Sequence, residues 1–191
     1  MDEESTLIEK AKNGDVHSFE KIISIHQEKI YNLAYRLTGN EPDARDLSQD
    51  VIIKVFCSIK NFYGKSTFST WLWRIIHNTF LDECKSKYRK NSSITTSIET
   101  VFNITDDKNQ PEKEAEKSDF RRQVKQSLLS IPPKYRMAVV MCDIQGFSYN
   151  EIADISRTSI GTVKSRLNRG RELLKKIILE SGTFSETNRL T

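Results

Sequence analysis

Glycine and proline, which most often interrupt regular structure, are scarce in this chain, with seven and four copies among 191 residues. Apolar residues recur three and four positions apart along most of its length, and this spacing places them on one face of an α-helix. The pattern predicts helices over 16–25, over 30–37 and from Pro42 onward. The residues expected to face their core are Phe19, Ile22, Ile23, Ile30, Leu33, Ala34, Leu37, Leu47, Val51, Val55 and Ile59. We therefore expect an all-α fold.

Two glycines mark expected breaks in the first half of the chain. Gly39 stops the second helix, and Gly64 lies in an expected loop from Phe62 to Thr67. A long helix follows and runs into a basic segment near Arg89. Its inward residues are expected to be Phe68, Leu72, Ile75 and Ile76. These helices are predicted to form one compact domain over residues 1–92.

The composition changes over residues 93–117, which are rich in Ser, Thr, Asn, Asp, Glu and Lys and poor in large apolar residues. Such a segment is typical of a flexible linker, although its end can also form the first turns of the next helix. Helical spacing resumes over 118–181, interrupted by Pro132 and Pro133, and a polar tail over 182–191 is expected to fray. The chain is thus predicted to hold two small helical domains joined by a flexible linker.

The second predicted domain contains the features of a helix-turn-helix. Ser148 and Glu151 form an S-x-x-E capping box that starts a short helix at Tyr149. A polar break follows, and Ser159 can then cap a second helix. The inward residues of the second helix are expected to be Ile160, Val163, Leu167 and Leu174.

The outward face of this second helix mixes small and cationic residues. These residues are Gly161, Thr162, Lys164, Ser165, Asn168 and Arg169. Small residues allow a close approach of the backbone and cations supply donors, so the face is suited to the major groove of DNA. An ordinary amphipathic helix with a solvated basic face is the alternative interpretation.

Charge and cysteine content restrict the function classes. The net charge is only +4, so a nucleic-acid footprint has to be local. The three cysteines and three histidines show no metal-ligand spacing, and no phosphate-binding loop or zinc signature occurs, so we expect no metal, no cofactor and no enzyme. The thiols are interpreted as buried or inert in a reducing cytosol. No apolar run approaches membrane length, which predicts a cytoplasmic protein that does not insert into a membrane.

Three stretches carry a resemblance to a known family: YNLAYRLTGNEPDARDLSQDVIIKVF, FSTWLWRIIHNTFLD and EIADISRTSIGTVKSRLNRGRELL. In this order and spacing, they resemble an extracytoplasmic-function (group 4) sigma factor of bacterial RNA polymerase. The first two look like the family's region 2 and the third like its region 4. The resemblance spans most of the chain, from about Phe19 to Leu174.

The resemblance implies a non-catalytic subunit that binds core RNA polymerase, directs it to specific promoters and assists promoter melting, in a stress or envelope response. The implied partners are the clamp coiled coil and the flap of core polymerase, promoter DNA, and an anti-sigma factor that is cytoplasmic or membrane-tethered. A single-stranded base extruded from the promoter would be held by a pocket and by cationic and aromatic surfaces.

The resemblance also implies three sets of functional residues. The polymerase-binding set is Asp46, Leu47, Gln49, Asp50 and Ile53, with a purely structural role for Leu47 as the alternative. The set for the downstream promoter element is Phe62, Gly64, Lys65, Ser66, Thr67, Trp73, Arg74, Asn78, Lys85 and Arg89. The set for the upstream, minus-thirty-five element is Thr162, Lys164, Ser165, Arg166, Asn168, Arg169 and Arg171.

Within the upstream set, Lys164, Ser165, Asn168 and Arg169 fit one groove-facing patch and are expected to read bases, while the other three are interpreted as phosphate contacts. Of the two tryptophans, Trp71 is expected in the core, and Trp73 could be either core or a stacking surface. A stand-alone helix-turn-helix regulator, with an N-terminal dimerisation or sensing domain, is the rival interpretation. The basic, aromatic N-terminal domain offers no evident ligand pocket and weighs against this rival.

Overall fold

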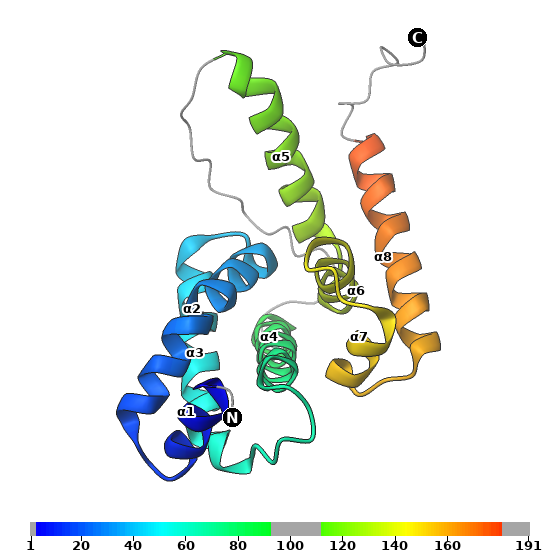
Figure 1. The fold of residues 1–191 in the computed structure, drawn as a ribbon. Helices are drawn as coiled ribbons and strands as arrows, with labels where there is room; N and C mark the ends of the chain where they lie inside the picture. Colours follow the sequence, from blue (N-terminus) through cyan, green and yellow to red (C-terminus); the bar gives the residue numbers. More distant parts are fainter. Residues whose placement is uncertain (1–2, 93–111, 181–191) are drawn as a thin grey trace.

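The computed structural model describes residues 3–92 and 112–180, and all regular elements in these two ranges are helices (Figure 1). The all-α prediction is therefore confirmed. The predicted linker lies outside the described residues up to residue 111, and so does the predicted tail over 182–191.

The N-terminal half contains α1 (Glu3–Lys12), α2 (Val16–Thr38), α3 (Glu41–Ser58), the short 3₁₀ turn η1 (Ile59–Asn61) and α4 (Phe68–Ser92). The two helices predicted over 16–25 and 30–37 are one helix, α2, because no breaker separates them and His26 continues their buried stripe. Asp15 caps the start of α2 by accepting a hydrogen bond from His17 N, and Gly39 ends it at φ +83°. Helix α1 was not predicted, and it buries only Ile8 and Ala11.

Helix α3 follows the predicted pattern closely. The Asn40 side chain accepts a hydrogen bond from Asp43 N at 2.9 Å, and Pro42 lies in the first turn. Leu47, Val51 and Val55 are fully buried against the neighbouring helices.

The C-terminal half contains α5 (Glu112–Ser130), α6 (Pro133–Val139), the π-helical turn η2 (Val140–Ile144), α7 (Tyr149–Ser156) and α8 (Ile160–Glu180). Helix α5 begins inside the segment assigned to the linker, whose end was also expected to be able to form helical turns. Gly170 permits the close crossing of α8 over α6, because a Cβ atom there would lie 2.7 Å from Val139 Cγ2 and 3.2 Å from the Tyr135 oxygen.

The two halves pack against each other rather than standing apart. Helix α4 contacts α6 and α7, and α2 contacts α5 and α6, as Figure 1 shows. The buried apolar residues of both halves join into one continuous cluster. This contact brings α4, where several downstream-element residues are predicted, against the first helix of the helix-turn-helix.

Candidate nucleic-acid interface

The local structure of the helix-turn-helix matches its sequence signals. The Ser148 hydroxyl accepts a hydrogen bond from Glu151 N at 3.3 Å, and a Glu151 carboxylate oxygen accepts one from Ser148 N at 2.8 Å. These bonds to Ser148 hold the pKa of Glu151 below its ordinary value. Arg157 ends α7 in the left-handed region at φ 50°, which turns the chain sharply. Ser159 then caps α8 by accepting a hydrogen bond from Thr162 N at 3.1 Å.

One face of α8 presents the predicted base-reading residues to solvent. Lys164, Ser165, Asn168 and Arg169 are all exposed. Arg169 also forms a surface ion pair of 3.3 Å with Glu172. On the opposite face Val163 and Leu167 are buried and Leu174 is half-buried, as predicted. Ile160 is instead 43% exposed, because it lies at the first position of α8, one turn before the helix reaches the core.

The three residues of the helix-turn-helix that are predicted to contact phosphates are partly buried or already paired within the protein. Thr162 belongs to the cap of α8 and is half-buried. Arg171 forms a two-pronged ion pair with Asp143, with distances of 2.5 and 3.0 Å, and these bonds raise the pKa of Arg171 further above its ordinary value. Arg166 is half-buried and lines a small cavity together with His77 of α4. Their DNA contacts stay predictions.

The loop from Phe62 to Thr67 is present as predicted, with Gly64 at φ +70°. Lys65 and Thr67 are exposed and Ser66 is half-buried. Phe62 is only 8% exposed, and its ring lies 5.7 Å from that of Phe68. The prediction that Phe62 contacts DNA does not fit this position, because its side chain anchors the loop to the core.

Other aromatic residues near this loop divide between core and surface. Trp71 is half-buried, with its ring 5.4 Å from Phe62 and 5.6 Å from Phe68, which agrees with the predicted core role. Tyr63 is 75% exposed and was not among the predicted residues. Tyr63 could have been found from the sequence, because it is an aromatic residue directly before Gly64 and Lys65 in an expected loop.

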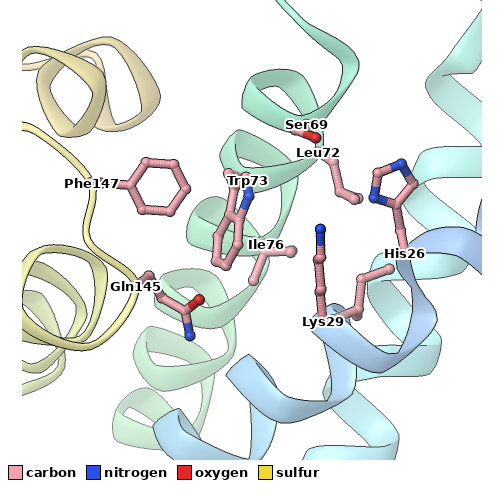
Figure 2. Close-up of a pocket in the computed structure, with 9 residues that line it drawn as sticks. His26, Lys29, Ser69, Leu72, Trp73, Ile76, Gln145 and Phe147 are labelled. Atoms are coloured by element: carbon pink, nitrogen blue, oxygen red, sulfur yellow. The ribbon is translucent and has the colours of Figure 1, made fainter.

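On α4, the predicted residues occupy two different environments. Trp73 packs edge-to-face on Phe147 with ring centres 4.9 Å apart (Figure 2). Arg74 donates a hydrogen bond to the Asp154 backbone oxygen at 3.2 Å. Asn78 is exposed and lies 3.1 Å from His77 Nδ1, and Lys85 pairs with Asp82 at 3.3 Å. Arg89 is exposed near the end of the helix. Trp73 and Arg74 therefore face the C-terminal half, while the other three face outward.

The predicted polymerase-binding residues lie along α3. Asp46, Gln49, Asp50 and Ile53 are exposed, with Ile53 at 52%. Leu47 is fully buried, so the alternative role as a core residue is correct and its side chain cannot contribute directly to a surface. Phe56, also 52% exposed and one turn after Ile53, extends the apolar edge of this face and was missed.

The described ranges also show how potential metal ligands, long apolar helices and thiols are distributed. No group of three or more potential metal ligands lies together there, and none of the helices is long and apolar enough to cross a membrane. The three thiols are free. Cys57 is exposed rather than buried, because it lies on the outer face of α3.

Comparison with known proteins gives matches across both halves. The family models described as Sigma-70 region 2 and Sigma-70, region 4 match residues 22–90 and 121–174. The chain is 40% identical over 159 residues to "ECF RNA polymerase sigma factor SigE" of Mycolicibacterium smegmatis, covering 83% of this chain and 60% of that one. It is 34% identical over 174 residues to "ECF RNA polymerase sigma factor SigW" of Bacillus subtilis, covering 88% of this chain and 93% of that one.

A solved structure supports the fold. The sigma factor RpoE of Bartonella quintana, in complex with its anti-sigma factor NepR, superposes with a TM-score of 0.65 at 23% identity. The match covers 84% of this chain and 96% of that one.

Proposed function

The chain belongs to the extracytoplasmic-function sigma factors of RNA polymerase, and from this premise we propose how its parts act in promoter recognition. In this proposal the chain binds core polymerase, recognises an upstream and a downstream promoter element, and assists melting of the downstream one. No step requires a catalytic group. We assign the region 2 domain to residues 1–92 and the region 4 domain to residues 118–181.

The observation that carries this proposal is the exposed face of α8. Lys164 and Asn168 lie one helical turn apart, as do Ser165 and Arg169, and all four side chains reach solvent on a helix whose start is capped by Ser159. Lys and Arg can address the O6 and N7 atoms of guanine, and Asn can address adenine. This face is therefore suited to reading the upstream element in the major groove.

The downstream element is proposed to bind the 62–67 loop and the outer surface of α4. Lys65, Ser66, Thr67 and Asn78 offer polar groups that reach solvent. Trapping an extruded base repays part of its unstacking cost, which is a few kcal/mol. Lys85 and Arg89 would then follow the sugar-phosphate backbone.

Partners follow from the surfaces and from the relatives. The acids and apolar edge of α3 form a mixed surface suited to a partner helix, and we assign it to the clamp coiled coil of core polymerase, with the flap contacting the region 4 domain. The Bartonella quintana protein is held by an anti-sigma factor. We propose an anti-sigma factor for this chain as well, and a role in the cytoplasm in a stress or envelope response.

Replacing Arg169 by alanine tests the reading of the upstream element. We expect a loss of about 1–3 kcal/mol in promoter binding by the polymerase holoenzyme, concentrated on one base pair, because a base contact discriminates sequences. Competition among promoters mutated at single positions would measure this loss. Lys176→Ala, an exposed change at the far end of the same helix, is the matched control. An equal loss on all sequences would mean that Arg169 contacts only phosphate.

A further inference from the structure

The loop that is proposed to trap a downstream base is anchored at both ends by aromatic residues. Phe62, its first residue, and Phe68, the first residue of α4, are 8% and 4% exposed. Their rings are nearly perpendicular, at 89°, with centres 5.7 Å apart, and both also contact the ring of Trp71. Edge-to-face packing of this kind stabilises an aromatic pair. The residues between the two anchors therefore lie on a short loop whose ends are fixed.

A buried histidine of α2 packs against one of these anchors. The His26 ring lies 5.3 Å from the Phe68 ring, and His26 is only 4% exposed. Figure 2 shows this ring beside Leu72 of the same helix, α4. His26 Nε2 lies 2.9 Å from a carboxylate oxygen of Glu4, in the first turn of α1. Because an ionised carboxylate can only accept hydrogen bonds, the nitrogen is the donor. Loss of this acceptor would leave a buried N–H group without a partner, which is costly.

Helix α1 reaches the other end of the loop directly. It contacts η1, the 3₁₀ turn over Ile59–Asn61 that leads into Phe62. Phe62 N donates a hydrogen bond to the Ile59 oxygen at 3.0 Å, which ties the turn to the first anchor. Figure 1 shows α1 at the end of the N-terminal half where the chain leaves α3 and enters this loop. A single helix thus contacts one end of the loop and, through Glu4 and His26, the other end.

Helix α1 is held in place by few buried residues of its own. It has ten residues, of which only Ile8 and Ala11 are buried. An isolated helix of this length is marginal in water, so α1 depends on its tertiary contacts. In the pair with Glu4, the His26 side chain is only 6% exposed, so this bond is less open to water than a surface ion pair. The bond between Glu4 and His26 therefore contributes a large share of what fixes α1.

We propose that Glu4 and His26 are positioning residues for the downstream element. Together they hold α1 against η1 and Phe68, and so fix the shape of the 62–67 loop that traps the extruded base, without touching DNA themselves. A trap that is already ordered loses little conformational freedom when the base enters, which favours capture. The match to Sigma-70 region 2 begins at residue 22 and does not include α1. This inference rests on the proposed function, because it concerns the loop that is assigned to the downstream element.

The test compares variants of this pair in the polymerase holoenzyme. Glu4→Ala removes the acceptor of the His26 hydrogen bond, whereas Glu4→Gln keeps an acceptor oxygen on a side chain of the same length. Glu3→Ala removes the neighbouring, exposed acid from the same first turn and is the matched control. His26→Leu removes the donor but leaves an apolar side chain against Phe68. The double variant of Glu4→Ala and His26→Leu completes a cycle that isolates the contribution of the pair.

Fluorescence anisotropy would measure two affinities for each holoenzyme, with DNA from a promoter that the wild type transcribes. One probe is each single strand of the downstream element in turn, and the other is a duplex that contains only the upstream element. We expect Glu4→Ala and His26→Leu to bind the preferred single strand about threefold to tenfold more weakly, as for the loss of one hydrogen bond. The double variant should be no weaker than either single variant, because both changes remove the same bond. Glu3→Ala and Glu4→Gln should match the wild type, and binding of the upstream duplex should stay unchanged in all variants.

Hydrogen exchange in the full-length variants would show whether the loop itself loosens. Exchange over residues 59–68 should be faster in Glu4→Ala than in Glu3→Ala, while exchange over α8 should be the same in both, because a local opening affects only the segment that loses its support. Circular dichroism would verify that each variant is folded.

Three results would overturn the inference. Equal affinities of the Glu3→Ala and Glu4→Ala holoenzymes for the single strand would show that the pair does not act on base capture. Equal exchange over residues 59–68 would show that the pair does not fix the loop. A loss of affinity for both DNA probes would show a general structural role. Because hydrogen exchange needs no promoter, it separates these failures from failure of the proposed function, which would appear as absent transcription by the wild type with core polymerase.

Discussion

At the residue scale, His77 connects burial to pH dependence. Its side chain is buried on α4, and burial lowers its pKa from 6.5, with the nearby charges of Arg166 and Lys85 acting in the same direction and Asp82 and the Asn78 hydrogen bond opposing them. A lowered pKa in the folded state means that the unfolded chain binds this proton first. The free energy of unfolding is therefore highest above the ordinary histidine pKa. It decreases as the pH falls from that value toward the lower pKa of His77 in the folded chain.

We accordingly predict that the free energy of unfolding falls as the pH drops below about 6.5, the ordinary value for histidine. Urea unfolding between neutral and mildly acidic pH would measure this slope. His77→Gln should reduce the slope, while His17→Gln, at an exposed position, should leave most of it. Equal slopes in the wild type and the His77 variant would contradict this assignment.

At the element scale, the crossing of α6 and α8 determines how the recognition helix is held. Gly170 lies where the two helices approach closely, and a Cβ atom there would lie 2.7 Å from Val139 Cγ2. Gly161 lies in the same helix but would meet only the Ser159 hydroxyl, at 3.7 Å. Both glycines lie in the backbone of α8, but a methyl group has no room at Gly170 and ample room at Gly161.

We predict that Gly170→Ala destabilises the chain by about 1–3 kcal/mol, because the helices must move apart. Gly161→Ala should be neutral or stabilising by up to about 1 kcal/mol, since alanine favours a helix over glycine. Chemical denaturation of both variants would compare them. A Gly170 variant as stable as the Gly161 variant would show that the crossing tolerates a methyl group.

The ends of the helices could be predicted from sequence patterns better than their packing. The capping box at Ser148, the cap at Ser159 and the stop at Gly39 were predicted because each depends on neighbours within a few residues. The union of two predicted helices into α2 was missed because the polar residues around His26 resemble a break. The burial of Phe62 was missed because it depends on how the loop folds back onto Phe68 and Trp71 of the next helix. The close crossing at Gly170 was missed because it depends on α6, which is distant in sequence.

At the scale of the whole molecule, the sequence predicts two domains but not their contact. Residues such as Trp73 and Arg74 have the chemistry of a DNA surface and also the chemistry of a protein interface, and local patterns cannot separate these roles. Arg136 in particular resembles any surface arginine until α2 and α6 are brought together. The exposure of the four residues predicted on α8 depends on one helix and could therefore be predicted from local spacing, while their contacts with DNA stay predictions.

Transcription in vitro, with purified core RNA polymerase and a library of promoter sequences, tests the central claim most directly. We predict that the chain starts transcripts from a small set of related promoters that share an upstream and a downstream element, and that core polymerase alone starts none of them. If the chain with core polymerase yields no promoter-specific transcript, while the chain alone binds duplex DNA tightly, it would act as a stand-alone regulator, and the proposed role in promoter recognition by polymerase would be wrong.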